Sequence, residues 1–577
     1  MLPRLLPLRR FARSRYASPF GEDIEQKKRN YQSLMDSAEG REHTPMEQKL
    51  QNYREDFEGL YRPRVRLAPS PTGQPHLGTL RTALFNFLFA RRHQGTLIMR
   101  LEDTDAARTV PGAEQQIVEQ LRWAGIHWDE GFATAHQPHG PYRQSERTPL
   151  YQKYARFLLD NGDAYRCFCS QEELRARRAQ SGNDALLYDR RCLYLTEREV
   201  AARLERGLPH VLRLLVPKES ALQRDVSVAE DLVQGRVEFP HSAVDDQVLL
   251  KADGRATYHL ANVVDDHLMG VTHVIRGKEW LPSLPKHLLL YAKLGFAPPR
   301  FAHLPLLLSA RGGKMSKREQ EVGIHNFQTM GYEPEALLNS VALLGWRSRQ
   351  HEKNPTSLDS QEAFYKAQFL RTPDLIEQFA LERVNKSDVK MDPSRFIFLN
   401  GEHLRRQYYF FNEQEKAQVL VQFRADMAEH IPDLRTEILR TPLPRMLQIF
   451  AIVLPRINFK WQMRHFRYFF GEPEDFFQLE MPDKPAKTWA KKLKKNPQFY
   501  KQLLGEVRAE VKQAARDFTK DQLNRTVSGF LFDRAGTVKN EDVYSPLRIA
   551  MTGHASGPSV GEIAELLGPK VFYERVD

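Results

Sequence analysis

The amino-acid sequence predicts an α/β domain built on a parallel sheet, followed by a mostly helical region. Residues 64–68 alternate polar and apolar side chains as a strand does, and a proline-rich loop follows them. Apolar residues then recur at helical spacing from Leu77 to Leu88, so a strand, a loop and a helix come in succession. Beyond residue 360, helical periodicity with almost no glycine continues to about residue 530.

A second strand is expected at residues 96–101, and the acidic run 102–105 follows it directly. Open α/β sheets bind ligands at the carboxyl ends of their strands, so these carboxylates are expected to meet a substrate amine. Residues 166–240 interrupt the α/β pattern and predict an inserted domain. The sheet is then expected to resume through strands at 249–250, 258–264 and 271–276.

Length and composition indicate a multidomain protein with a polyanionic partner. A chain of 577 residues is too long for one hydrophobic core. Its 85 lysines and arginines exceed its 73 acidic residues, and a net charge of +12 favours a nucleic acid as the partner. The three cysteines are too few for a secreted disulfide framework and indicate a reducing compartment. No apolar run reaches the length of a membrane span, so no membrane partner is expected.

The N-terminal residues 1–18 resemble a mitochondrial transit peptide in composition. Five arginines lie among leucines and serines, and the first acidic residue is Glu22. The alternative is a disordered basic tail that binds RNA. We therefore expect the mature protein in the mitochondrial matrix, and we expect residues 19–62 to form an N-terminal extension of unassigned function.

The C-terminal part is expected to bind RNA. Residues 347–400 should form a linker with stalk-like helices, and residues 401–577 an α-helical region. Between residues 483 and 501, seven lysines are interleaved with aromatic side chains, namely Trp489, Phe499 and Tyr500. Lysines suit the RNA backbone and aromatic rings suit unstacked bases. The alternative is an ordinary solvated helix face.

Two short motifs about 240 residues apart carry the chemistry. The first, Pro75-His76-Leu77-Gly78-Thr79, opens the first helix, where an imidazole and free backbone amides can face a phosphate. The second, Lys314-Met315-Ser316-Lys317-Arg318, follows a glycine-flanked loop whose lysines can neutralise a leaving pyrophosphate. In this order and at this separation, the motifs resemble the two signatures of class I aminoacyl-tRNA synthetases. The chain most resembles a glutamyl-tRNA synthetase of the bacterial and mitochondrial type.

This resemblance implies a Rossmann-like class I synthetase catalytic domain over residues 63–346, with an inserted acceptor-binding domain at about 166–240. An all-α anticodon-binding region would follow over residues 401–577. The implied reaction is the ATP-dependent ligation of L-glutamate to tRNA(Glu) through a glutamyl adenylate, with tRNA(Gln) as a further candidate acceptor. Mg²⁺ is expected with ATP, held by the phosphate oxygens and not by a protein metal site. Members of the family are commonly monomers. Thr79 replaces the family's usual second histidine, as it commonly does in glutamate enzymes.

The resemblance also assigns site residues. His76, Lys314 and Lys317 are the expected catalytic groups. Glutamate carries two carboxylates and one ammonium group, so a selective site needs two cationic clamps and one anion, for which Arg66, Arg276 and Glu102 are the candidates. The further residues expected to bind glutamate are Leu67, Ala68, Ser70, Tyr258, His259, Leu260, Ala261 and Asn262. ATP is expected to contact His76, Gly78, Glu279, Lys314, Met315, Ser316, Lys317 and Arg318.

The three cysteines all fall within the predicted insertion. Some relatives hold a structural zinc with a pattern similar to that of Cys167, Cys169 and Cys192, but three thiolates are one ligand short of a closed tetrahedral site. Tyr188 and Tyr194 are the candidate fourth ligands. Buried free cysteines are therefore favoured over zinc.

Four other functions fit parts of the sequence. Glutaminyl-tRNA synthetases usually show a different motif at residues 68–73 and a β-barrel anticodon domain. The enzyme that glutamylates queuosine in tRNA lacks an anticodon-binding region, whereas over 200 residues follow Arg318 here. A nucleotidyltransferase for small molecules would not need the basic helical region. A non-catalytic RNA-binding paralogue should have lost at least one of His76, Lys314, Lys317 and Arg276.

Overall fold

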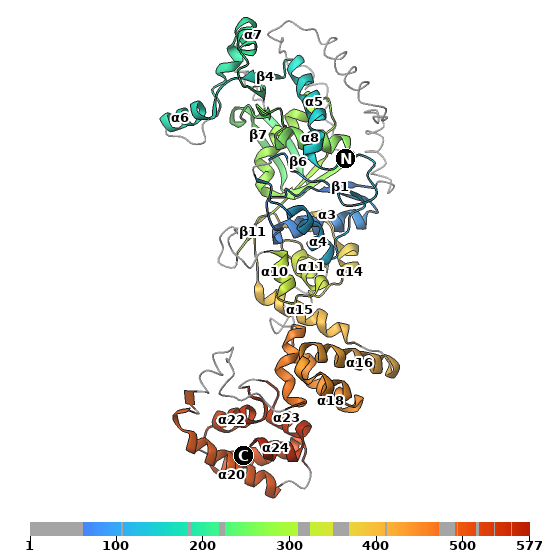
Figure 1. Cartoon of the computed structure of the whole chain (residues 1–577), viewed down its shortest axis with the longest axis vertical. Helices are drawn as coiled ribbons and strands as arrows, with labels where there is room; N and C mark the ends of the chain where they lie inside the picture. Colours follow the sequence, from blue (N-terminus) through green and yellow to red (C-terminus); the bar gives the residue numbers. More distant parts are fainter. Residues whose placement is uncertain are drawn as a thin grey trace. The chain divides into compact units, whose positions relative to one another are not determined.

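The computed structural model divides the chain into two compact units, Met1–Met330 with Pro334–Pro393, and Gly331–Glu333 with Ser394–Asp577 (Figure 1). The boundary between Pro393 and Ser394 falls inside the predicted linker 347–400, whereas Gly331–Glu333 lies before that linker. The predicted transit peptide and nearly all of the predicted extension lie outside the described residues. The structure describes residues 62–105, 108–181, 187–217, 226–309, 323–349, 368–409, 412–471, 491–492, 494–514, 518–535, 537–554 and 557–576.

The first unit contains a parallel sheet that begins with the predicted strand. Strand β1 (Arg64–Leu67) pairs in parallel with β2 (Thr96–Met99), which pairs with β3 (Glu130–Gly131). On its other side β1 lies beside β9 (His273–Gly277), because the Thr272 amide donates a hydrogen bond of 2.9 Å to the Arg64 carbonyl. The carboxyl ends of β1 and β9 therefore open onto the same edge of the sheet.

The sheet continues from β9 through β10 to two strands, β6 and β7, that lie within the predicted insertion. Strand β10 (Arg300–Leu304) pairs in parallel with β9, and Phe301 of β10 lies opposite Asp231 of β6 (Val226–Asp231). Strand β7 (Gly235–Pro240) pairs antiparallel with β6 at the edge. Residues 226–240 are thus hydrogen bonded to the main sheet, and Asp231 is brought next to β10.

A second, antiparallel sheet carries the cysteines. It consists of β4 (Ala164–Cys167), β5 (Val211–Leu214) and β8 (Val248–Leu250), in that order. The expected strand at 249–250 exists, but it belongs to this sheet and not to the parallel one. Helices α6 (Gln171–Ser181) and α7 (Glu197–Glu205) lie between β4 and β5 in the sequence.

The expected strand at 258–264 is wrong, because these residues begin helix α8 (Tyr258–Leu268). Most of α8 is buried, including the apolar side chains of residues 260–264. A short run without polar alternation does not distinguish a buried strand from a buried helix. The expected strand at 271–276 is confirmed as β9.

Helices cover the parallel sheet and complete the first unit. Helix α3 (Leu77–Arg92) packs against β1, β2 and β9, and α8 packs against α5 and α9 in the apolar core. The remaining elements of this unit are α4 (Ala113–Trp123), α5 (Thr148–Asp160), α9 (Leu284–Lys293), α10 (Ile324–Thr329), α11 (Pro334–Ala342), α14 (Thr372–Gln378), β11 (Leu307–Leu308) and β12 (Val389–Lys390).

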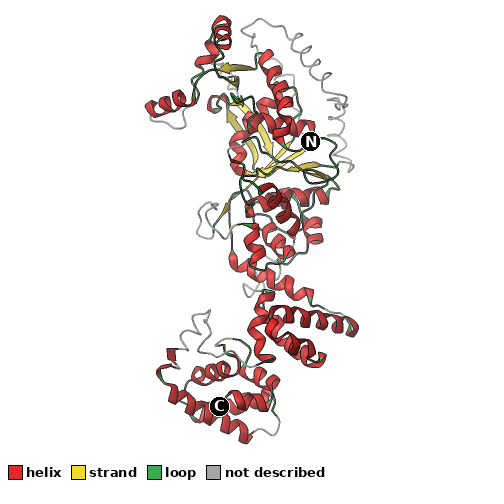
Figure 2. Cartoon of the chain, in the orientation of Figure 1, coloured by secondary structure: helices red, strands yellow, loops and turns green. Residues whose placement is uncertain are grey.

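The described part of the second unit is helical, as the sequence predicts (Figure 2). Its core is apolar and includes an edge-to-face contact between Phe423 and Phe450, whose ring centroids are 5.1 Å apart. No helix in the described part of the chain is both long and apolar enough to cross a membrane. The helices are α15 (Pro393–Gln407), α16 (Glu413–His430), α17 (Arg435–Arg440), α18 (Leu443–Val453), α20 (Pro497–Ala514), α21 (Lys520–Asp533), α22 (Asn540–Thr552), α23 (Val560–Leu567) and α24 (Pro569–Arg575).

The predicted RNA-stacking aromatics differ in exposure. Phe499 is 47% exposed, but Tyr500 is only 7% exposed and its hydroxyl donates to an Asp542 carboxylate oxygen at 3.3 Å. Tyr500 is therefore a core residue of the helical unit and not a surface for bases. Trp489 lies outside the described residues.

Candidate active site

A cavity of about 470 Å³ opens at the carboxyl ends of β1 and β9. One wall is the loop that joins β1 to α3, and the opposite wall comes from Tyr258 and residues 276–280. Ten of the predicted site residues line it together, namely Arg66, Leu67, Ala68, Ser70, His76, Gly78, Glu102, Tyr258, Arg276 and Glu279. Residues about 200 positions apart in the sequence therefore line one cavity.

His76 occupies the N-cap of α3. Its Nδ1 accepts a hydrogen bond from the Thr79 amide at 3.2 Å, so in the neutral imidazole the proton is on Nε2. A Cβ atom at Gly78 would lie 2.9 Å from Cε1 of His76. Glycine at this position therefore leaves room for the imidazole itself, in addition to the predicted room for a nucleotide.

Arg66 and Glu102 are joined by a buried network of charges. Oδ1 of Asp266 accepts from Nε of Arg66 at 3.2 Å and from Nη1 of Arg100 at 2.7 Å. Arg100 also donates to Oε1 of Glu102 at 3.2 Å, and Asn262 donates to the same oxygen at 3.2 Å. Asn262 thus acts on the site by holding Glu102. The network fixes the predicted anion and one predicted cation in a single rigid arrangement.

The pKa values in this network follow from burial and from the neighbouring charges. Burial raises the pKa of Glu102 above its ordinary value, although Arg100 and Arg66 oppose the rise. Burial would also raise the pKa of Asp266, but Arg66 and Arg100 outweigh it and hold that pKa below its ordinary value. Asp266 is therefore the permanent anion of the pair.

Arg100 is supported from behind by a second carboxylate. Asp265 accepts from Nε of Arg147 at 2.7 Å and from the Tyr151 hydroxyl at 2.7 Å, and it lies 3.9 Å from Nε of Arg100. All of these side chains are buried. Arg66, Arg100 and Arg147 thereby match Asp265, Asp266 and Glu102 in charge.

Arg276 has a different environment from Arg66. Its guanidinium is only 4% exposed, and it donates to Nε2 of His303 at 3.0 Å and to the Tyr258 hydroxyl at 3.1 Å. Nδ1 of His287 lies 3.3 Å from its Nη1. In the described part of the chain, this guanidinium forms no ion pair with a carboxylate. A buried cation without a counter-charge, on the wall of a cavity, is suited to bind an anion.

Two aromatic rings and one carboxylate complete this wall. Tyr258 packs on Trp280 with ring centroids 4.3 Å apart. A Cβ atom at Gly277 would lie 2.1 Å from Oε2 of Glu279, so the glycine allows that carboxylate to fold back over the strand end. Glu279 is therefore held at the rim, where the sequence expected a nucleotide contact.

Four residues of the predicted glutamate site do not line the cavity, namely His259, Leu260, Ala261 and Asn262. Leu260 and Ala261 are fully buried in the apolar core, and Nδ1 of His259 lies 3.1 Å from Nε2 of His287. Residues 258 and 262 are four apart on α8 and share one helix face, whereas those between them point elsewhere. Of residues 258–262, Tyr258 therefore lines the cavity directly, and Asn262 contacts the lining residue Glu102.

The predicted lysine motif, Lys314 to Arg318, lies outside the described residues. The described residues on either side of it border the cavity. Leu307 lines it before the motif, and Gly323 forms a β-bridge with His76 after it. The Ile324 amide also donates to the Pro75 carbonyl at 3.1 Å. The described residues that follow the lysine motif are therefore anchored beside the first motif.

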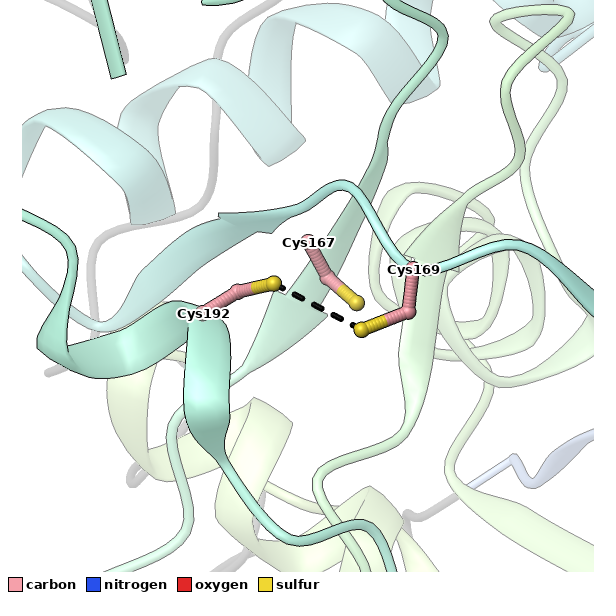
Figure 3. A group of neighbouring side chains, drawn as sticks. All are labelled: Cys167, Cys169 and Cys192. Carbon is pink, nitrogen blue, oxygen red and sulfur yellow. Dashed lines mark hydrogen bonds between the residues drawn. The ribbon is translucent and has the colours of Figure 1, made fainter. Parts of the chain in front are cut away.

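The cysteines form a separate cluster at the end of β4, where Cys167 ends the strand, Cys169 lies in the following loop and Cys192 lies in a short 3-10 helix (Figure 3). The three Sγ atoms of Cys167, Cys169 and Cys192 lie within 4.8 Å of one another. The Tyr188 hydroxyl is 3.3 Å from Sγ of Cys167 and 3.5 Å from Sγ of Cys169. Tyr194, the other predicted oxygen ligand, is 73% exposed. The Tyr188 hydroxyl thus contacts two of the thiols, and none of these residues lines the cavity.

Comparisons with known proteins agree with this geometry. The family described as "tRNA synthetases class I (E and Q), catalytic domain" matches residues 63–386, and "Anticodon binding domain" matches residues 421–577. The chain is 37% identical over 525 residues to the glutamate–tRNA ligase of Chlorobaculum parvum, covering 89% of this chain and 97% of that protein. The chain belongs to the glutamate–tRNA ligase family.

Other members of the glutamate–tRNA ligase family are similarly close. The ligase of Pseudomonas fluorescens is 38% identical over 517 residues, covering 89% of this chain and 94% of its own length. A crystal structure of a glutamate–tRNA ligase from Elizabethkingia meningosepticum, in complex with its amino acid, matches with a TM-score of 0.67 and 30% identity. That match covers 89% of this chain and 98% of the solved chain. The predicted family, fold class and enzyme class are confirmed.

Sequence reasoning missed the residues that support the ligase site. Arg100, Asp266 and His303 do not belong to either signature motif. One signal was present, because Asp265 and Asp266 are adjacent carboxylates in an otherwise apolar stretch, and such groups are buried only with cationic partners. The identity of those partners could not be read from spacing along the chain.

His76 is predicted to act beyond its role as a helix cap. His76→Asn keeps an N-cap oxygen but lacks the Nε2 proton, whereas His76→Ala lacks both. We expect both variants to form the adenylate roughly 10²-fold more slowly, since a preorganised donor is lost. Only His76→Ala should lose stability, by about 1 kcal/mol. Single-turnover kinetics and thermal unfolding measure the two effects, and full activity in His76→Asn would leave His76 as a cap alone.

The buried histidines beside Arg276 predict a pH dependence of stability. Burial, followed by the charges of Lys286 and Arg276, lowers the pKa of His259 from 6.5 to about 3. The unfolded chain therefore binds a proton that the folded chain does not, and stability falls as the pH decreases from 6.5 towards 3. The loss from one such group is at most about 1.4 kcal/mol per pH unit. His259→Asn should flatten the decline in thermal stability over this range, and exposed His127→Asn should not. Equal declines in all three proteins would contradict the assignment.

Proposed function

We propose that this chain attaches L-glutamate to tRNA(Glu) in mitochondria, using ATP and a glutamyl-adenylate intermediate. The observation that carries the proposal is the pairing, in one cavity, of a buried arginine without a counter-charge and a helix N-terminus capped by His76. The first group suits a substrate carboxylate, and the second suits a phosphate. The family relationship supports the same reaction.

The charged groups of the cavity suit glutamate in particular. Arg276 would bind one carboxylate and Arg66 would assist with the other, while Glu102 would accept the ammonium group. Arg66 already shares Asp266 with Arg100, so its charge is partly compensated, whereas that of Arg276 is not. The cavity therefore has more positive charge to offer than an amino acid with a neutral side chain requires.

Adenylate formation needs positioning and not a protein nucleophile. An oxygen of the substrate α-carboxylate bonds to the α-phosphorus of ATP, and the bond to the β-phosphate bridging oxygen breaks to release pyrophosphate. The Nε2 proton of His76 and the first amides of α3 would stabilise charge on the phosphates. Lys314 and Lys317 would neutralise the leaving pyrophosphate. Mg²⁺ would accompany ATP on its phosphate oxygens.

The second step transfers glutamate to RNA. A terminal ribose hydroxyl of the tRNA attacks the carbonyl carbon of the adenylate, and AMP leaves with the anhydride oxygen. The helical region matched by the anticodon-binding family would hold the other end of the tRNA. The net charge of +12 supports this polyanionic partner.

The location in mitochondria rests on the N-terminal composition alone. Residues 1–18 contain five arginines and no acidic residue. We also propose tRNA(Gln) as a second acceptor, which would make glutamine incorporation depend on a later amidation. We expect the chain to act as a monomer.

The cysteine cluster fits a structural zinc in its donor set. Sulfur atoms that share a tetrahedral zinc at about 2.3 Å are about 3.8 Å apart, and Sγ of Cys169 is 3.6 Å from Sγ of Cys192. Cys167, Cys169 and Cys192 would hold the ion, with Tyr188 as the nearest oxygen, and the metal would stabilise the antiparallel sheet. The same contacts also serve as hydrogen bonds between free thiols. Metal analysis of the purified protein distinguishes the two arrangements.

The charging reaction tests the proposed function directly. Protein that begins near Tyr16 is mixed with ATP, labelled glutamate and separately transcribed mitochondrial tRNA(Glu) or tRNA(Gln). We expect both tRNAs to be charged, and Lys317→Ala to slow activation by roughly 10² to 10³ with little change in the KM for glutamate. Charging of tRNA(Glu) alone would remove the second acceptor. Charging of neither tRNA would overturn the proposal.

A further inference from the structure

We propose that Asp231 and His303 act as positioning residues for Arg276, by holding its guanidinium ready for a substrate carboxylate without neutralising it. The three side chains form a buried series that runs from the end of β6, across β10, to β9. The inference rests on the proposed function, because it concerns how the amino-acid side of that site is built. Neither Asp231 nor His303 lines the cavity.

The geometry leaves His303 one protonation state. Nδ1 of His303 is 2.6 Å from Oδ2 of Asp231, and Nε2 is 3.0 Å from Nε of Arg276. A guanidinium nitrogen can only donate, so Nε2 must accept and carries no proton. The proton is therefore on Nδ1 and is donated to Asp231. His303 is a neutral imidazole that transmits the orientation of Asp231 to Arg276.

Asp231 is itself fixed by the backbone. Its Oδ1 accepts from the amides of Val233, Gln234 and His303 at 3.0, 2.8 and 3.1 Å. Both carboxylate oxygens are thus used, and the side chain is completely buried. Burial would raise the pKa of Asp231, but the hydrogen bonds from His303 and the backbone hold it below its ordinary value. The acceptor for Nδ1 of His303 is consequently ionised and immobile.

A neutral contact has a different consequence from an ion pair. Arg66 is paired directly with Asp266, so a substrate must share that charge. The nearest ionised group in the series behind Arg276 is one imidazole further away. His287 provides a second nitrogen beside Nη1, and burial lowers its pKa well below the ordinary value, so it is also neutral. The guanidinium is therefore oriented by neutral groups, and its charge remains available to an incoming carboxylate.

Three substitutions separate orientation from simple packing. His303→Asn can keep the donor to Asp231 but lacks the acceptor for Arg276. His303→Gln places an amide oxygen near the position of Nε2 and restores that acceptor. Asp231→Asn presents an amide donor to Nδ1 of His303, which moves the imidazole proton to Nε2. There the Nε2 proton faces the Nε proton of Arg276, and the hydrogen bond between the two side chains is lost. Exposed His127→Asn and exposed Glu230→Gln, the latter on the same strand as Asp231, are matched controls.

The readouts are the KM for glutamate, the KM for ATP and kcat in charging of tRNA(Glu), together with thermal unfolding. We expect His303→Asn and Asp231→Asn to raise the KM for glutamate by about 10- to 100-fold, as for the loss of a charge-assisted hydrogen bond, with the KM for ATP unchanged. His303→Gln should remain within about threefold of the original enzyme, because the neutral acceptor is restored. Both controls should behave as the original enzyme does.

Other outcomes overturn the inference in distinguishable ways. If the original enzyme charges tRNA but His303→Asn and Asp231→Asn keep its KM for glutamate, the positioning role is wrong and the proposed function stands. If the KM values for glutamate and ATP rise together, or if all three variants fail to fold, the series is part of the core only. If His303→Asn alone fails to fold, the inference stands only when Asp231→Asn raises the KM for glutamate and His303→Gln does not. If the original enzyme charges no tRNA, the proposed function itself fails.

Discussion

The burial of Arg276 without a carboxylate partner is the constraint on which the site depends. A guanidinium removed from water is costly unless its protons are accepted and its charge is balanced. Here Tyr258 and two imidazoles are placed to accept the protons, whereas no described carboxylate balances the charge. The strand order matters because it places β10 between β6 and β9, and so brings His303 and Asp231 behind Arg276. In the proposed function, the substrate carboxylate would supply the missing negative charge.

On the opposite side of the cavity, buried arginines are balanced by buried carboxylates. There, three arginines and three carboxylates are buried together, and Asp266 joins Arg66 to Arg100. Such a network is rigid because removal of any member leaves an uncompensated buried charge. It holds Glu102 in place for an ammonium group. The site therefore combines a wall whose arginines are paired with carboxylates and a wall whose arginine is not, and we propose that this asymmetry favours an amino acid with two carboxylates.

The signature motifs and the charge requirement of glutamate were sufficient to predict much of the cavity lining, including Arg66, His76, Glu102 and Arg276. These residues lie at local features, such as a strand end or a helix start, that the spacing of residues along the chain reveals. Supporting residues such as Arg100 and His303 could not be predicted, because Asp266 is 166 positions from Arg100 and Arg276 is 27 positions from His303, and these pairs meet only in the folded chain. Residues 258–264 were wrongly predicted as a strand for a related reason. They are largely buried, so no alternation of polar and apolar residues distinguishes the helix α8 from a strand. Residues 226–240 were predicted as part of the insertion but belong to the main sheet, because their own sequence does not reveal the pairing of β6 with β10.

The distance between a bound glutamate carboxylate and the Arg276 guanidinium tests this account most directly. A crystal structure of the chain with glutamate provides it. The account predicts a carboxylate oxygen about 3 Å from a guanidinium nitrogen of Arg276, with the ammonium group beside Glu102. Glutamate bound in the cavity with no carboxylate near Arg276 would contradict the claim that the substrate supplies the missing charge.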